Sequence, residues 1–71
     1  MSEDVLAPLS GKIVSISVEV GTTIEEDDEL LVIEAMKMET PVFAPCSGTV
    51  SKIAVKKGDA VEEDDLIAVI D

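Results

Sequence analysis

Histidine is absent from this sequence, and cysteine and aromatic residues occur only once each, as Cys46 and Phe43. Cys46 has no second cysteine for an intramolecular disulfide and no histidine beside it as a base or metal ligand. A thiol enzyme and a zinc site therefore lack their necessary partners, and we interpret Cys46 as a small buried apolar residue. Because 46% of the 71 residues are hydrophobic, the chain should fold around a core of aliphatic side chains and methionine.

Long hydrophobic segments are also missing. No apolar run approaches the roughly 20 residues that span a bilayer as a helix. Residues 1–4 have neither the basic region nor the apolar segment of a secretory signal. We therefore expect a soluble, cytoplasmic protein that makes no direct contact with a membrane.

Basic residues are few. Five lysines stand against 16 acidic residues, which gives a formal net charge of −11 at pH 7. This charge repels phosphate backbones and anionic lipid surfaces, which argues against nucleic acid as a partner. Lys52, Lys56 and Lys57 are the one basic cluster, and we interpret it as a solvated face.

The most informative feature that the sequence does contain is an internal repeat. Residues 7–34 and 44–71 align without a gap at an offset of 37, with identical residues at 13 of 28 positions. Each copy has a Pro-x-Ser-Gly turn, an apolar stretch, a second glycine, four adjacent acidic residues and a final apolar run. The apolar stretches are short and rich in β-branched residues, as in the alternating segment 13–20, which predicts strands and no helix.

The length of the chain allows one domain, which we place at residues 1–71. One copy of the repeat covers only one side of a sheet, so we expect the two copies to pack face to face. The fold predicted is an all-β flattened barrel or sandwich with pseudo-two-fold symmetry. Continuous apolar runs do not reveal their register, but the residues expected between the halves are Ile16, Val18, Val32, Ile53, Val55 and Val69.

The acidic segments 25–28 and 62–65 suggest a calcium site, because hard cations bind carboxylate oxygens. Four adjacent acidic residues lack the alternating spacing and the turn glycine of a calcium loop. We therefore interpret both segments as solvated turns.

Residues 35–43 belong to neither copy and are the place to look for function. Strands are expected to end near residue 34 and to resume at residues 40–43, so residues 35–39 must reverse the chain in a hairpin tip. Tight hairpin turns favour Asn-Gly, Asp-Gly or Gly-x, and none of these pairs is present. Local rules are broken most often at functional sites, so we predict that Lys37 protrudes there.

Two methionines flank this lysine, and their flexible, polarizable side chains adapt to several partner surfaces. The segment fits a docking site as well as it fits a modified lysine.

The sequence around Lys37, Glu34-Ala35-Met36-Lys37-Met38-Glu39, closely resembles the biotinyl domain family of biotin carboxyl carrier proteins, whose attachment signature is Ala-Met-Lys-Met. The motif stands at the midpoint of a duplicated β unit, as it does in that family, and the resemblance covers residues 5–71. It implies two four-stranded antiparallel sheets, eight strands in all, with the attachment hairpin at residues 35–39, opposite the chain termini. It also implies biotin joined by an amide to Lys37, with Ala35, Met36 and Met38 as the recognition motif.

The function that this resemblance implies is that of a carrier with no catalytic residue of its own. Biotin on Lys37 would carry CO₂, as carboxybiotin, from a biotin carboxylase to a carboxyltransferase or decarboxylase component. Biotin protein ligase would attach the biotin and would have to activate the amine, since nothing beside Lys37 in the sequence does so. The family commonly has glycine where Asp27 and Asp64 stand, and Asp tolerates a left-handed backbone better than most residues.

Two other functions remain open from the residues. A lipoyl carrier resembles this fold and also uses a hairpin lysine, but it typically has Asp before that lysine and lacks the pair of methionines. An unmodified interaction or metal-binding module would use the acidic turns instead. The chain also lacks the protruding insertion that marks the carrier of bacterial acetyl-CoA carboxylase, which favours other biotin enzymes.

Overall fold

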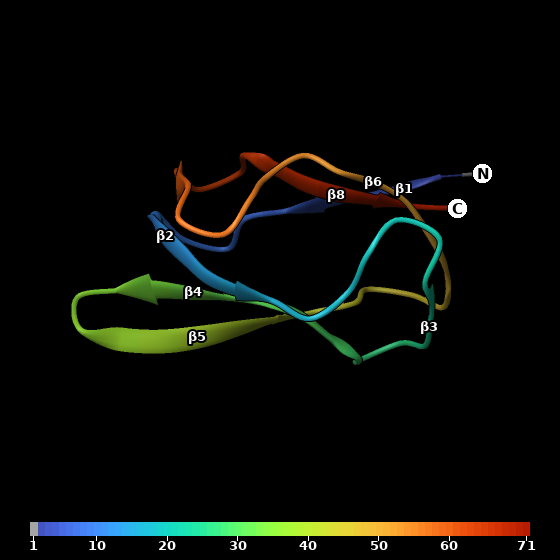
Figure 1. Cartoon of the computed structure of the whole chain (residues 1–71), viewed down its shortest axis with the longest axis horizontal. Helices are drawn as coiled ribbons and strands as arrows, with labels where there is room; N and C mark the ends of the chain where they lie inside the picture. Colours follow the sequence, from blue (N-terminus) through green and yellow to red (C-terminus); the bar gives the residue numbers. More distant parts are fainter. Residues whose placement is uncertain (1) are drawn as a thin grey trace.

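Eight strands form the regular structure of residues 2–71, the part of the chain that the computed structural model describes, and no helix occurs among these residues. The strands are β1 (Glu3–Leu6), β2 (Gly11–Ile16), β3 (Thr23–Ile24), β4 (Glu29–Ala35), β5 (Met38–Phe43), β6 (Gly48–Ile53), β7 (Ala60–Val61) and β8 (Leu66–Ile70). They form two antiparallel sheets with the orders β1-β8-β6-β3 and β5-β4-β2-β7. The sheets pack face to face in a molecule 33 × 17 × 17 Å in extent (Figure 1). The predicted all-β fold of two four-stranded sheets is confirmed, as a sandwich.

The two sheets have the same internal order once each strand is exchanged for the strand about 37 residues away. β1 to β4 correspond in this way to β5 to β8. The correspondence of β1 with β5 extends beyond the predicted copies, because residues 40–43 occupy in one sheet the place that residues 3–6 occupy in the other. Residues 36 and 37, which connect β4 to β5, have no counterpart in the chain.

The acidic segments 25–28 and 62–65 form tight turns. In each, the N–H of the fourth residue donates to the carbonyl of the first at 3.0 Å. The third residue, Asp27 or Asp64, has a φ of 72° or 73°, which is typical of a type II turn and is accepted by Asp more readily than by most residues. The carboxylate of the fourth residue accepts the N–H of the first at 2.9 Å. The interpretation of these segments as turns is confirmed.

Each acidic turn also docks against the other half of the sandwich. The turn 62–65 exchanges two backbone hydrogen bonds of 2.8 Å with Ala7, and one of its N–H groups donates to the Ser10 hydroxyl at 3.3 Å. The turn 25–28 makes the same three contacts with the residues 37 positions after Ala7 and Ser10. These contacts join the two halves at both ends of the molecule.

The core is aliphatic, and its most completely buried large side chains are Ile13, Leu30, Leu31, Ile33, Val50, Ile67 and Ile70. Of the six residues predicted between the halves, Val55 is buried, and Ile16, Val18 and Ile53 pack against the core while half-buried. The prediction is wrong for Val32 and Val69. Their neighbours in the strand are buried while they are only half-buried, so side-chain alternation places them on the outer faces.

A bulge explains why the pattern of residues 13–20 does not persist as one alternating strand. The register of β2 against β4 shifts between Ile13 and Ser15, and an extra residue at such a bulge resets the alternation. Ile13 and Ile16 therefore both contact the core, and the strand ends at Ile16. The same shift occurs in β6.

Candidate functional site

The hairpin of β4 and β5 projects at the end of the molecule opposite the chain termini (Figure 1). Its ladder runs from the pair Glu29 and Phe43 to the pair Ala35 and Met38. Two residues, Met36 and Lys37, connect the strands, so the chain reversal expected within residues 35–39 is found there.

The turn at this tip has an unusual backbone for its residues. Met36 has a φ of 54° and Lys37 a φ of 66°, and a two-residue hairpin with both φ values positive is a type I′ turn. This turn matches the right-handed twist of paired strands, but side chains other than Asn, Asp and Gly adopt it at a cost of roughly 1–2 kcal/mol per residue. The pairing of β4 with β5 holds the conformation in place.

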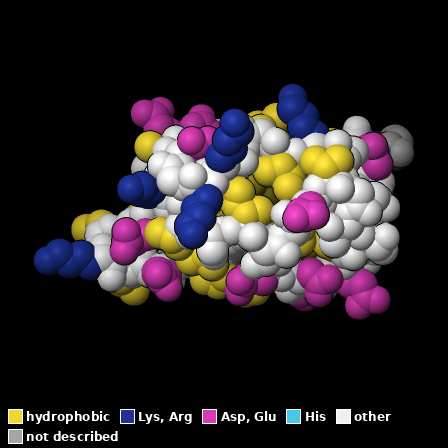
Figure 2. All heavy atoms as spheres, in the orientation of Figure 1, with side chains coloured by type: hydrophobic (Ala, Val, Ile, Leu, Met, Phe, Trp, Pro, Cys, Tyr) yellow, Lys and Arg dark blue, Asp and Glu magenta, His cyan; other side chains and the backbone are white. Residues whose placement is uncertain are grey.

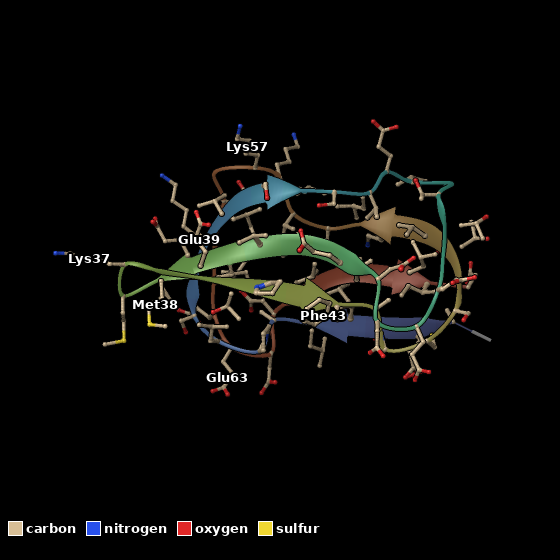
Figure 3. The ribbon with its side chains drawn as sticks, turned by 90° about the horizontal axis from the view of Figure 1, so that it is seen from below. Lys37, Met38, Glu39, Phe43, Lys57 and Glu63 are labelled. Atoms are coloured by element: carbon tan, nitrogen blue, oxygen red, sulfur yellow. The ribbon has the colours of Figure 1, made fainter. Side chains whose placement is uncertain are left out.

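The side chains of the tip lie in solvent. Met36 is 95% exposed and Met38 is 68% exposed, and Lys37 is exposed as well. Figure 3 shows Lys37 extending away from the body of the molecule at the outermost point of the hairpin. Ala35, half-buried, closes the ladder opposite Met38, so the structure brings all four predicted site residues together.

Gly11, in β2, supports the base of the hairpin and was not singled out as a site residue from the sequence. A Cβ atom at Gly11 would lie 2.5 Å from the carbonyl oxygen of Glu34 and 2.6 Å from the Cγ2 atom of Ile33. Glycine therefore lets β2 approach the last residues of β4 closely. The available signal was the identity of Gly11 and Gly48 in the two copies, which we assigned to turns.

A row of charged residues crosses the outer face of the sheet at the base of the hairpin. Lys12 of β2 pairs with Glu34 of β4, and Glu34 pairs with Glu39 of β5. All three side chains are exposed. Like charges directly opposite each other destabilise a strand pair, and the ammonium group of Lys12 beside Glu34 offsets part of this repulsion.

Charge is unevenly distributed over the surface. On the face shown in Figure 2, lysine side chains stand towards the hairpin and the middle, whereas acidic ones occur along the whole length, at both ends. Lys56 and Lys57 belong to a tight turn next to β2, since the N–H of Gly58 donates to the carbonyl of Ile13 at 2.7 Å. With Lys52 they are exposed, which agrees with the solvated face that we predicted.

Residues 2–71 contain no second cluster of reactive side chains in a cavity. An open depression of about 420 Å³ lies between the edge strands β1 and β5, and Asp4 is its single ionisable lining residue. Phe43, another lining residue, lies well away from Lys37 (Figure 3). Cys46 is half-buried against the core rather than fully buried.

Neither a metal site nor a membrane-spanning helix is found among residues 2–71. Within residues 2–71, no group of three or more His, Cys, Asp or Glu side chains is placed to hold a metal ion. Over the same residues, no helix has the length and apolar character needed to cross a bilayer.

Comparison with known proteins identifies the family. The sequence model of the family described as "Biotin-requiring enzyme", which groups biotin and lipoyl attachment domains, matches residues 2–70. The methylmalonyl-CoA decarboxylase subunit gamma of Veillonella parvula is 42% identical over 41 residues, 58% of this chain and 32% of that protein. The glutaconyl-CoA decarboxylase subunit gamma of Acidaminococcus fermentans is 46% identical over 41 residues, 58% of this chain and 28% of that protein. The matched region thus spans about a third or less of each relative.

Solved structures give the same result over nearly the whole chain. The crystal structure of the Kluyveromyces lactis urea carboxylase superimposes with a TM-score of 0.92 and 41% identity, over 99% of this chain and 6% of the carboxylase. A single-chain, multi-domain long-chain acyl-CoA carboxylase superimposes with a TM-score of 0.90 and 28% identity, over 96% of this chain and 7% of that protein. The chain belongs to the family of biotin-requiring enzymes, within which it is a biotin carrier domain.

Proposed function

We propose that Lys37 is the residue to which biotin is joined, through an amide of its side-chain amine. The observation that carries the proposal is the type I′ turn, which holds Lys37 exposed at the outermost point of the hairpin (Figure 3). Of the five lysines in the sequence, Lys37 alone stands between two methionines. Ala35, Met36 and Met38 then form the surface by which other enzymes recognise the hairpin.

The chemistry of the site fits the cofactor. A primary amine in solvent can attack the carboxyl group of biotin once the ligase has activated that group as an acyl-adenylate. The amide C–N bond would form, the bond from the acyl carbon to AMP would break, and the amine would give up a proton. Bound biotin supplies a group that takes up CO₂ at one enzyme and gives it up at another. The residues of this chain present the amine to the ligase and afterwards hold the arm clear of the domain surface.

Amide formation also changes the character of the hairpin tip. Lys37 loses its positive charge, and its side chain becomes part of a long uncharged arm. Met36 and Met38 remain on either side as exposed apolar groups, which adapt their rotamers to different enzyme surfaces. A tethered arm of this kind raises the local concentration of its cargo at each partner even where docking is weak.

We infer that the domain serves a biotin-dependent carboxylase or decarboxylase in the cytoplasm. Its partners are then biotin protein ligase, a biotin carboxylase, and a carboxyltransferase or decarboxylase component. The decarboxylase gamma subunits and the two carboxylases that resemble this chain support the inference.

Intact-mass spectrometry tests the attachment site. The domain is coexpressed with biotin protein ligase and, separately, with a lipoate ligase, and Lys37→Ala serves as the control because it leaves the other four lysines in place. We expect one biotin adduct on the wild type and none on Lys37→Ala. A lipoyl adduct, no adduct, or an adduct that persists in the Lys37→Ala variant would each contradict the proposal.

A further inference from the structure

The two methionines of the hairpin are placed where an oxidant reaches them directly. Met36 is 95% exposed and Met38 is 68% exposed. Oxidation of a thioether requires contact between the sulfur lone pair and the oxidant, so its rate follows access to the sulfur. Both side chains are therefore open to a small peroxide, and Met36 is the more exposed.

The rest of the described molecule does not depend on methionine. Within residues 2–71 the buried core contains only valine, isoleucine, leucine and alanine. Methionine oxidation usually damages proteins because it places a polar sulfoxide in an apolar core. Among residues 2–71 the change would be confined to the hairpin tip, where the sulfoxide stays hydrated and leaves the core untouched.

The same change matters at the site of recognition. A thioether is an apolar, adaptable surface, whereas a sulfoxide is polar, chiral and a strong hydrogen-bond acceptor. An enzyme that covers the tip must remove water from this acceptor, and burial of a polar group without a partner is unfavourable. Oxidation therefore weakens docking without altering Lys37 itself.

We propose that Met36 and Met38 form a peroxide-sensitive modification site that controls recognition of the hairpin by biotin protein ligase. In the reaction, the sulfur lone pair attacks one oxygen of hydrogen peroxide and the O–O bond breaks. That oxygen remains on sulfur, which is oxidised by two electrons, and the other oxygen leaves as water with both protons. Methionine sulfoxide reductases reverse the change. The effect on the ligase rests on the proposed function of Lys37, whereas oxidation of the sulfurs does not.

The test uses the whole domain with Cys46→Ser, which removes the competing thiol. The protein is treated with hydrogen peroxide, peptide mapping locates the added oxygen atoms, and circular dichroism follows the fold. We expect one oxygen on each of Met36 and Met38, with Met36 reacting first and the spectrum unchanged. Failure of these sulfurs to react under conditions that oxidise free methionine, or loss of the fold on their oxidation, would overturn the proposal.

The second measurement is kcat/KM for biotinylation by purified biotin protein ligase. We expect it to fall about fivefold or more after peroxide treatment, mainly through KM, and to recover after treatment with both reductases. The variant Met36→Leu/Met38→Leu, compared with its own untreated sample, should show no change on peroxide treatment. An oxidised domain that is biotinylated as fast as the reduced domain would refute the proposed control of recognition by oxidation.

The result expected if oxidation of Met36 and Met38 does not affect the ligase differs from the result expected if biotin is not attached to Lys37. In the first case the reduced protein still gains biotin on Lys37, and only its sensitivity to peroxide is absent. In the second case the reduced protein gains no biotin at all.

Discussion

At the scale of single residues, the hairpin tip combines two side chains that its backbone does not favour. Met36 and Lys37 both have positive φ values, and the turn that they form is most stable with Asn or Asp followed by Gly. The pairing from Glu29 to Ala35 against β5 fixes the strands on either side, so the turn is restricted to the geometries of a two-residue hairpin. The sequence therefore accepts a local cost at the point where a particular side chain must stand in solvent.

Replacement of Met36 by Asn measures this cost. The Met36 side chain is 95% exposed, so its removal loses almost no packing, while Asn accepts a positive φ far more readily. We expect Met36→Asn to raise the free energy of unfolding by roughly 0.5–1 kcal/mol, measured by urea denaturation. The matched control is Met38→Asn, which makes the same chemical change within a strand, where Asn is disfavoured. Equal stabilisation by both variants would show that the backbone of the tip is not the cause.

Asp27 allows a second test of the left-handed backbone at a residue far from the tip. Its φ of 72° suits glycine, which the family commonly has at this position. Alanine adopts this φ only with strain. We expect Asp27→Ala to be less stable than Asp27→Gly by about 1 kcal/mol. Both variants remove the same negative charge, so thermal unfolding compares the backbones alone. The pair Asp64→Ala and Asp64→Gly should behave in the same way, and equal stability within either pair would contradict the explanation.

At the scale of the elements, the attachment hairpin depends on the close approach of β2 to β4. Gly11→Ala places a methyl group 2.5 Å from the Glu34 carbonyl oxygen, which β4 must move to accommodate. We expect a loss of about 1–3 kcal/mol in stability, the usual range for overpacking. We also expect a fall in kcat/KM for biotinylation, because the displaced strand carries one side of the tip.

Gly48→Ala is the matched control for this prediction. Gly48 takes the place of Gly11 in the other sheet, and a Cβ atom there meets the Asp71 carbonyl oxygen and the Ile70 side chain, at the end away from the hairpin. Gly48 also has a φ of 158°, which residues other than glycine rarely adopt. We therefore expect Gly48→Ala to lose at least as much stability as Gly11→Ala, with unchanged kcat/KM for biotinylation. If both variants lower kcat/KM equally, the role of Gly11 is stability alone and not the position of the hairpin.

The sequence predicted the elements better than their registers. The offset of 37 residues and the punctuation of each copy were enough to predict two similar sheets and a reversal within residues 35–39. The runs 30–33 and 66–70 are apolar at every position, so they carry no period that distinguishes the face of Val32 from that of Leu31. The bulges of β2 and β6 are shifts in register against their partner strands β4 and β8. The sequence of one strand alone does not predict such a shift.

The candidate site followed from the sequence because its signal is local. A motif of four residues, placed between two copies of a repeat, predicted a tip that the structure places in solvent. The support from Gly11 was missed because it depends on contacts between residues more than 20 positions apart, and a glycine before an apolar stretch is also typical of an ordinary turn.

At the scale of the whole molecule, the main feature is a formal charge of −11 on a body only 33 Å long. The acidic turns contribute eight of the 16 acidic residues. Segments 25–28 and 62–65 each dock against the other half of the sandwich, so the two groups of four lie apart. Repulsion between like charges destabilises a compact state relative to an expanded one. Stability should therefore depend on how far these charges interact through the solvent.

Salt provides the test of this dependence. The screening length falls from about 30 Å at 0.01 M ionic strength to about 8 Å at 0.15 M, that is, from the length of the molecule to the spacing of near neighbours. We expect the free energy of unfolding to rise with NaCl over this range, and each kcal/mol gained raises Tm by about 4–8 °C in a domain of this size.

A variant with fewer charges separates this effect from general effects of salt. Glu26→Gln/Glu63→Gln removes two of the 16 acidic groups from exposed turn positions at which the hydrogen bonds to Ser47 and Ser10 use the backbone N–H. We expect this variant to be more stable than the wild type at 0.01 M NaCl and to gain less from added salt, so that the two Tm values converge at high salt. Parallel curves would mean that NaCl acts on burial of apolar surface rather than on repulsion. The excess of acidic residues would then have no measurable effect on the stability of the fold.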